Sequence, residues 1–208
     1  MKGLLLGGFA AIGTGSGAML ALHAGAGLDP MYSVISEYAW ASVGWLLPTS
    51  LTLFAVGAAL VAAALRRAGA GPWVVGLLVA WGICMFLIGA FPTDKPGVPL
   101  SLSGGIHRYA AFGAFLVMPV AGLLVARARV RYARQVKVLC GVALSALLVV
   151  VVPYVVQMCG LPFAGVGVPA GLTQRVVVVT EVAVLALIAM SLLDSRTRNR
   201  AGVRLKTS

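Results

Sequence analysis

The chain has 208 residues, of which 61% are hydrophobic and 10% are charged, and its formal net charge is +11. This balance excludes an ordinary soluble domain, because such a domain needs a charged surface to face water. Apolar stretches of about 18 residues or more run without a charge, which is the length that a helix needs to cross a bilayer. The positive charges lie at the ends of these stretches, so they argue against a nucleic-acid partner.

Apolar windows predict six membrane-spanning helices, over residues 4–25, 44–65, 73–91, 109–126, 138–158 and 175–194. Lipid offers the backbone no hydrogen-bond partners, so each span must pair its own N–H and C=O groups as a helix. The runs also lack the alternation of apolar and polar residues that marks a β-barrel. We therefore expect an all-α integral membrane protein, with one bundle over residues 1–195 and a basic cytoplasmic tail over residues 196–208.

The distribution of basic residues predicts the orientation of this bundle. Thirteen of the sixteen Lys and Arg residues precede the first span, follow the second or the fourth span, or lie in the tail. The positive-inside rule assigns that end to the cytoplasm, which places both termini there, in a multi-pass protein of the inner (plasma) membrane. Lys2 and the segment Ala24-Gly25-Ala26 resemble the ends of a signal peptide, but the apolar stretch between them is longer than a usual one.

Small residues and cysteines within the spans are interpreted as packing residues. Gly13, Gly15 and Gly17 would let the first helix approach a neighbour closely. The three cysteines have neither the parity of disulfides nor the spacing of a metal site, so we expect them to act as small apolar side chains. They are Cys84, Cys140 and Cys159. The two histidines lie far apart in the sequence and no cofactor motif is present, so we expect neither a metal nor a cofactor.

The carboxylates are distributed unevenly between the two sides of the predicted bundle. Asp194 alone lies on the inner side, and the other four lie in outer loops or in the outer part of a span. These four are Asp29, Glu37, Asp94 and Glu181. Glu181 is six residues into the last span, roughly 9 Å below its start at the rise of an α-helix. An ionised carboxylate at that depth is costly, so Glu181 must be paired, protonated or next to water.

Histidine, arginine and aromatic residues accompany the outer carboxylates. Glu181 either serves a function or forms a salt bridge with Arg108 or Arg175 that holds helices together. His107 is the base that we expect, because imidazole ionises near neutral pH. The candidate substrate-binding residues are His23, Tyr38, Trp45, Tyr109, Tyr154 and Arg175. The tyrosine and tryptophan rings in this set are either anchors at the membrane interface or walls of a pocket that stabilises a cation.

Five short motifs resemble a known family of bacterial membrane proteins. They are Ile35-Ser36-Glu37, Gly44-Trp45-Leu46, the run GAFPTD over Gly89–Asp94, Ile106-His107, and the run GLTQR over Gly171–Arg175. Together they are similar, over nearly the whole chain, to the family called domain of unknown function 998. The resemblance implies six to seven spans and no particular activity. It also implies a polar cluster that contains Asp29, Glu37, Asp94, His107 and Arg175.

A fainter likeness, in size, span number and scattered carboxylates, is to the small membrane terpene cyclases of actinobacterial indole-terpenoid pathways. It leads to the hypothesis of a membrane enzyme that uses protonated carboxylates on an isoprenoid or lipid-like substrate, most concretely in protonation-initiated cyclisation. A carboxyl in a low-dielectric pocket stays protonated and can act as a general acid, while aromatic faces shelter the carbocation. Asp29, Glu37, Asp94 and Glu181 are the candidate acids, with His107 as the base.

Two alternatives from other functional classes remain open on the sequence. One is a small proton-coupled transporter, in which the same carboxylates bind a proton or a cation. The other is a membrane protein that binds a partner without catalysis. In each case the expected partners are a hydrophobic small molecule and membrane lipid, and the sequence predicts no oligomeric state.

Overall fold

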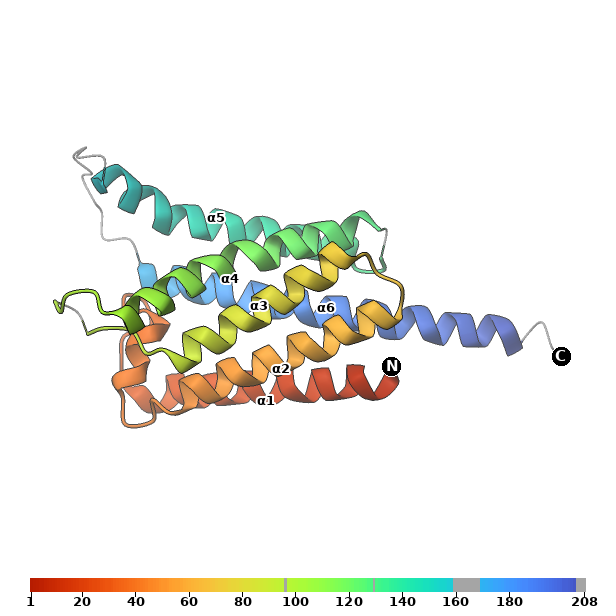
Figure 1. The fold of residues 1–208 in the computed structure, drawn as a ribbon, viewed down its shortest axis with the longest axis horizontal. Coiled ribbons are helices and arrows are strands. Elements are labelled where there is room, and N and C mark those ends of the chain that lie inside the picture. The colour runs from red at the N-terminus through yellow and green to blue at the C-terminus, as the bar shows by residue number, and fades with distance from the viewer. Residues whose placement is uncertain (96, 129, 159–168, 205–208) are drawn as a thin grey trace.

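A computed structural model of the protein (Figure 1) describes residues 1–95, 97–128, 130–158 and 169–204. Within these ranges the side chains are described except at residues 150, 153–158 and 196–204. The described residues form α-helices and one short 3₁₀-helix, η1, and contain no strand. The elements are α1 (Lys2–Ala26), η1 (Ile35–Trp40), α2 (Leu46–Arg67), α3 (Pro72–Ala90), α4 (Leu102–Arg127), α5 (Ala133–Met158) and α6 (Ala170–Arg204).

Five of the described helices are long and apolar enough to cross a membrane, namely α1, α2, α3, α4 and the part of α6 over Ala170–Ser195. This confirms an all-α, multi-pass membrane protein. The predicted span over residues 138–158 corresponds to α5, which is not among the five, so a count of six spans stays a prediction. α1 begins and α6 ends at the same end of the bundle (Figure 1), whose side of the membrane also stays a prediction.

The helices extend beyond the limits that hydropathy predicted, and α4 and α6 do so most. α4 begins at Leu102 instead of residue 109, because Ser101 caps it and accepts a hydrogen bond from the N–H of Gly104 at 3.0 Å. Hydropathy missed this first part because five of its seven residues, over 102–108, are polar or glycine. α6 continues without a break to Arg204, so the basic segment after residue 195 begins as an extension of the last helix.

Glycines set the close spacing of α1 and α2. A Cβ at Gly8 would come within 3.3 Å of Val61, and a Cβ at Gly15 would come within 3.0 Å of the Phe54 ring. A Cβ at Gly13 or Gly17 would meet nothing within 4 Å. Of the three glycines predicted to pack closely, only Gly15 therefore does so.

The described cysteines are free thiols that contribute to packing. Cys140 is buried, and a Cβ at Gly122 would lie 2.6 Å from its sulfur, so α4 and α5 approach closely at this point. Cys84 is partly buried. This agrees with the packing role that the sequence indicated, and Cys159 lies outside the described residues.

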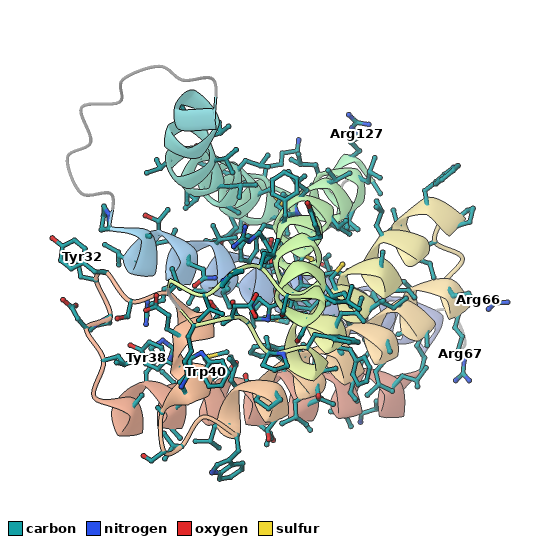
Figure 2. The ribbon with its side chains drawn as sticks, turned by 60° about the vertical axis from the view of Figure 1, so that its left-hand side comes forward. Tyr32, Tyr38, Trp40, Arg66, Arg67 and Arg127 are labelled. Carbon is teal, nitrogen blue, oxygen red and sulfur yellow. The ribbon has the colours of Figure 1, made fainter. Side chains whose placement is uncertain are left out.

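The two ends of the bundle differ in their side chains (Figure 2), and we name them accordingly. The loop end carries η1 and the segments 27–45 and 91–101, with Tyr32, Tyr38 and Trp40. The basic end carries both ends of the described chain, with Arg66, Arg67 and Arg127. α6 contacts α1, α2, α4 and α5, so it connects the two ends through the middle of the bundle.

Candidate functional site

The segment 27–45 is fastened to the start of α6 by hydrogen bonds between residues far apart in the sequence. The N–H of Ile35 donates to Oε1 of Gln174 at 2.6 Å. In the other direction, the N–H of Leu172 donates to the carbonyl of Met31 at 3.0 Å. These bonds hold η1 over the first turns of α6, and we call this contact the clasp.

Arg175 and Gly171 complete the clasp. Nη1 of Arg175 donates to the carbonyl of Ser33 at 2.8 Å. Gly171 sits where the two backbones meet: a Cβ there would overlap the carbonyl oxygen of Ser33 and lie 2.8 Å from that of Pro30. Only glycine fits at this position, because both neighbours are backbone atoms that cannot turn away.

Three of the predicted binding residues, His23, Tyr38 and Arg175, contact one another behind the clasp. Nδ1 of His23 lies 2.7 Å from the carbonyl of Met19, which can only accept, so Nδ1 carries a hydrogen. Nε2 therefore accepts the hydrogen bond that Nε of Arg175 donates at 2.9 Å. The Tyr38 ring lies 4.9 Å from the His23 ring and 5.1 Å from the Arg175 guanidinium. None of the three lines the cavity described next, so their geometry supports a role in holding the clasp.

A cavity of about 360 Å³ opens between α4, α5 and α6, under the segments 27–45 and 91–101. Its apolar lining consists of Val34, Ala111, Phe112, Phe115, Leu147, Val151, Ala170 and Val177. Its polar lining consists of Ser36, Thr93, His107, Arg108 and Gln174. A second hollow of about 200 Å³ shares part of this lining and adds the charged loop residues. We call the two together the loop-end cavity.

His107 is the buried titratable side chain of the loop-end cavity. Its Nδ1 lies 2.9 Å from the carbonyl of Phe91 and 3.1 Å from that of Ile88. Carbonyl oxygens only accept, so Nδ1 carries a hydrogen and the neutral ring leaves Nε2 with a lone pair. No described residue hydrogen-bonds Nε2, and the side chain is 6% exposed. His107 is thus oriented by two backbone carbonyls and can accept a hydrogen bond or a proton from a ligand.

The mouth of the loop-end cavity contains charges of both signs. Glu37, Asp94, Lys95 and Arg108 all line the outer hollow. Nζ of Lys95 lies 5.2 Å from the centre of the Trp40 ring, so η1 and the segment 91–101 meet above the cavity. This mouth is suited to a polar or charged group, whereas the deeper wall is suited to an apolar one.

Asp94 acts on the start of α4. Its Oδ2 accepts a hydrogen bond from the N–H of Ser101 at 2.9 Å, and its carboxyl lies against Gly104. The hydrogen bonds from the Ser101 hydroxyl and N–H, with the charge of Arg108, hold the pKa of the Asp94 carboxyl below its ordinary value. A carboxylate at a helix N-terminus is also favoured by the helix dipole. Asp94 is therefore better suited to capping than to donating a proton.

Acidification should weaken this cap. Because the folded-state pKa of Asp94 is lowered, its stabilisation is present above the ordinary carboxyl pKa and is lost as pH falls through the folded-state value. We expect Asp94→Asn to lower the melting temperature at neutral pH, with the difference from the parent shrinking towards strongly acidic pH. Thermal unfolding in detergent over a pH series measures this. Asp29→Asn is the control, and a difference that stays constant with pH contradicts the prediction.

The remaining predicted residues lie elsewhere. Asp29 is exposed and accepts a hydrogen bond from the N–H of Met31 at 2.8 Å, within its own turn. Trp45 and Tyr109 are 65% and 74% exposed, which matches the alternative of interface anchors. Tyr154 belongs to α5, and its side chain lies outside the described residues.

Glu181 is buried in the bundle, away from the other carboxylates. It is 1% exposed, and its Oε2 accepts a hydrogen bond from Nε1 of Trp81 at 3.0 Å. Its Oε1 is enclosed and has no hydrogen-bond partner among the described residues. The salt bridge to Arg108 or Arg175 that we considered is not formed in the described structure. Nor is there, in that part of the chain, a group of three or more His, Cys, Asp or Glu side chains that could hold a metal ion.

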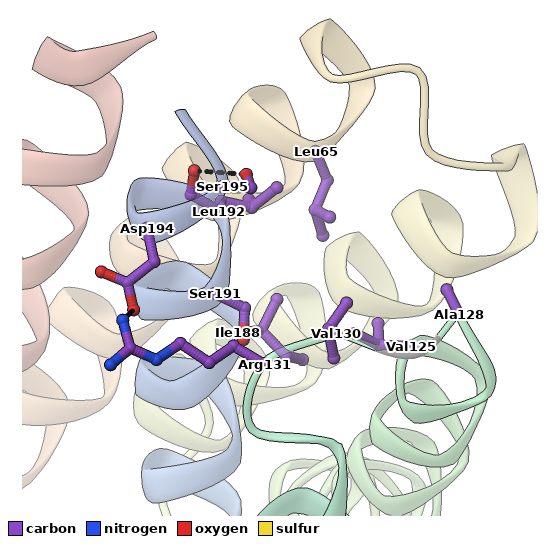
Figure 3. Close-up of a pocket in the computed structure, with 10 residues that line it drawn as sticks. All are labelled: Leu65, Val125, Ala128, Val130, Arg131, Ile188, Ser191, Leu192, Asp194 and Ser195. Atoms are coloured by element: carbon purple, nitrogen blue, oxygen red, sulfur yellow. Dashed lines mark hydrogen bonds and ion pairs between the residues drawn. The ribbon is translucent and has the colours of Figure 1, made fainter. Parts of the chain in front are cut away.

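A separate cavity of about 430 Å³ lies at the basic end, between α2, α4, α6 and the segment that follows α4. Figure 3 shows Arg131 and Asp194 at its edge, with Nη1 of Arg131 2.8 Å from Oδ2 of Asp194. The hydroxyl of Tyr132 donates to the same oxygen at 3.0 Å. Asp194 is thus paired with an arginine, in line with its predicted place on the basic side.

Sequence reasoning did not select Gln174 or Trp81 as site residues. Gln174 bonds a residue 139 positions away, and Trp81 bonds one 100 positions away. Hydrophobic periodicity carries no information about such contacts. One indication of these contacts was present in the sequence. Gln174 and Trp81 each place a polar group at or within an apolar span, where lipid would leave that group without a hydrogen-bond partner.

Comparisons with known proteins give one match. The model of a family described as "Protein of unknown function (DUF998)" matches residues 6–191. Neither the search of curated proteins nor the search of solved structures found a match. The likeness to terpene cyclases therefore gains no support from these comparisons.

Proposed function

Because this chain belongs to the DUF998 family, whose description assigns no activity, we propose a function from the geometry of the loop-end cavity. The protein is a multi-pass protein of the inner (plasma) membrane that binds an amphiphilic molecule, an isoprenoid or another lipid-like compound, in this cavity. His107 accepts a hydrogen bond or a proton from the bound molecule. The basic end faces the cytoplasm and the loop end faces the opposite side.

The observation that carries this proposal is that one cavity joins a charged mouth to an apolar wall. Glu37, Lys95 and Arg108 line the mouth, while Phe112 and Phe115 line the depth. A headgroup would stay near water and its apolar part would lie against α4, α5 and α6. The volume of about 360 Å³ is within the usual range of small-molecule sites.

The same geometry favours proton acceptance at His107 over protonation-initiated cyclisation. The low pKa of Asp94 keeps that carboxyl ionised. Glu37 lines the outer hollow at the mouth, together with Lys95 and Arg108, and not the apolar wall. Glu181 does not line the loop-end cavity. The larger hollow, which has the apolar wall, therefore has no carboxyl among its described lining residues, whereas His107 lines it directly.

Ligand binding can be tested by photo-crosslinking with a prenyl phosphate that carries a diazirine in its apolar part. We expect labelled peptides from α4 and α6 that border the cavity. Ala111→Leu fills part of the cavity, and we expect it to reduce labelling about tenfold, a change of about 1.4 kcal/mol in binding. Mass spectrometry of the labelled protein gives both the sites and the yield.

The structure offers a matched control for this experiment. A groove of about 410 Å³ between α2 and α3 includes Ala59 and has no charged residue in its lining. Ala59→Leu makes the same substitution there, and we expect it to leave labelling at the loop-end cavity unchanged. Equal loss of labelling in both variants, or labelling confined to the α2–α3 groove, would overturn the proposed binding site.

The transporter alternative is supported by a different observation, the presence of cavities at both ends of the bundle. Packed side chains separate these cavities, as in a gated carrier rather than an open channel. If the protein is a carrier, a labelled lipid-like substrate should cross the membrane of sealed vesicles that contain it. If the protein is an enzyme, a chemically new product should form in the same vesicles. One incubation followed by mass spectrometry therefore distinguishes transport from catalysis.

A further inference from the structure

A small cavity inside the bundle adjoins the loop-end cavity. It has a volume of about 30 Å³ and shares five lining residues with the larger cavity, His107 and Gln174 among them. Nine of its twelve lining residues are apolar, and the polar ones are Ser36, His107 and Gln174. Its volume exceeds the roughly 10–15 Å³ that one water molecule needs. The imidazole and amide supply polar partners for it. A water from the loop end would therefore find both room and hydrogen-bond partners in the small cavity.

Glu181 and Trp81 form the next layer of side chains beyond this small cavity. Val178 lines the cavity, and Glu181 follows it by three residues on the same face of α6, a rise of about 4.5 Å. Met85 also lines it, and Trp81 precedes Met85 by four residues on α3, a rise of about 6 Å. The hydrogen-bonded pair thus lies about one helical turn from the small cavity on both helices.

The surroundings of Glu181 are almost free of polar partners. Trp81 donates the single hydrogen bond that its carboxyl receives from a described residue. Among the described side chains, the other titratable groups close enough to interact with its charge are the thiols of Cys84 on α3 and Cys140 on α5. Thr180 on α6 donates its hydroxyl to backbone carbonyls instead. A carboxylate with so few donors is costly in a low-dielectric interior, and binding a proton removes that cost.

The route from Glu181 to the basic end is closed by packed apolar side chains. Val184, Leu185 and Ile188 follow on α6, and each is no more than 1% exposed. Ile188 is also the residue at which α6 first lines the basic-end cavity (Figure 3). It lies seven residues beyond Glu181, about 10 Å along the helix axis. Glu181 is therefore much closer to the cavities of the loop end.

We propose that Glu181 is a proton-binding site that exchanges with the loop end of the bundle and not with the basic end. The proton leaves water in the loop-end cavity and passes by way of Nε2 of His107 and a water in the small cavity. It then binds Oε1 of Glu181, where an O–H bond forms as the donor's bond to that proton breaks. Release follows the same steps in reverse. This site does not require a bound ligand, so it stands apart from the proposed function.

The fluorescence of Trp81 can report the protonation of Glu181, because the indole donates a hydrogen bond directly to that carboxyl. The other three tryptophans are at least 48% exposed and can be replaced by phenylalanine with little effect on packing. They are Trp40, Trp45 and Trp73. The resulting protein is reconstituted into vesicles and sorted by orientation with an affinity tag on its C-terminus. Trp81 emission is then followed after a pH jump on one side of the membrane.

We expect a pH jump on the loop side to change Trp81 emission at least about tenfold faster than a jump on the basic side. Glu181→Gln should abolish the change. Val178→Phe fills the small cavity and should slow the loop-side response, as should His107→Asn. Val179→Phe is the matched control, because Val179 is adjacent in sequence and 66% exposed, and it should leave the rate unchanged.

Three results would overturn the proposal. One is an equal response from both sides, and another is a response that persists in Glu181→Gln. The third is the lack of any change in Trp81 emission between acidic and alkaline pH. These measurements use the protein without ligand, so they can fail while photo-crosslinking succeeds, or the reverse. The sidedness measurement needs no cavity-filling substitution, so a variant that fails to fold leaves the test intact.

Discussion

Gly171→Val is expected to separate the segment 27–45 from α6 and to prevent ligand binding at the loop-end cavity. The new side chain would overlap the carbonyl of Ser33 and crowd that of Pro30, which are fixed backbone atoms. Overpacking of this kind costs about 1–3 kcal/mol or more. The hydrogen bond from Ile35 to Gln174 should be lost with the contact. Faster amide exchange over residues 31–41, with unchanged helix content by circular dichroism, would show the opened clasp.

Gly105→Val is the control for this variant. Gly105 also lies in the first turns of a helix, α4, but a Cβ there meets nothing within 4 Å. It therefore carries the cost of a β-branched residue in a helix without the clash. We expect its exchange pattern and ligand labelling to match those of the parent. If Gly171→Val also matches the parent, the clasp does not hold the cavity in shape.

His107→Asn is expected to reduce ligand labelling strongly while leaving the protein folded. Asparagine places an N–H donor close to the position of Nδ1, so the bond to the Phe91 carbonyl can persist. It has no group at the position of Nε2, which is the atom that we assign to the ligand. We expect labelling to fall about tenfold or more, equivalent to about 1.4 kcal/mol. The free energy of unfolding should change by less than that.

His107→Leu separates the two roles of this histidine. It leaves the carbonyls of Ile88 and Phe91 without the donor that they share. An unsatisfied buried polar group costs about 1–3 kcal/mol, so this variant should be less stable than His107→Asn and equally poor in labelling. If His107→Asn retains full labelling, then His107 serves the fold alone and the ligand contact lies elsewhere.

The sequence predicted the helical, multi-pass character of the protein, because lipid imposes length and hydropathy on every span. The ends of the helices were harder to predict. α4 starts at Leu102 through a cap at Ser101 and a carboxylate from Asp94, and neither residue adds to a hydropathy average. Local hydrogen bonds thus determined a boundary that a search for apolar windows does not detect.

The candidate site was predictable in part, because charges and histidines are rare in such a chain. His23, Tyr38 and Arg175 were all selected, and the structure brings them together. Their partners in the chain were not predictable, since Arg175 and His23 are 152 positions apart. The enclosure of Glu181 followed from its depth in a span, whereas its pairing with Trp81 depended on how α3 meets α6.

The length of α6 has a mechanical consequence. One uninterrupted helix of 35 residues begins within the clasp and ends beyond the bundle at Arg204, a distance of about 52 Å at the helical rise. The helix packs against α1, α2, α4 and α5 and then extends past the bundle (Figure 1), so a tilt of the whole helix displaces its far end most. A tilt of about 5° would move the far end by about 4–5 Å over that length. A tilt of α6 that starts beneath the loops would thus become visible at the opposite surface, once the helices packed around α6 adjust to it.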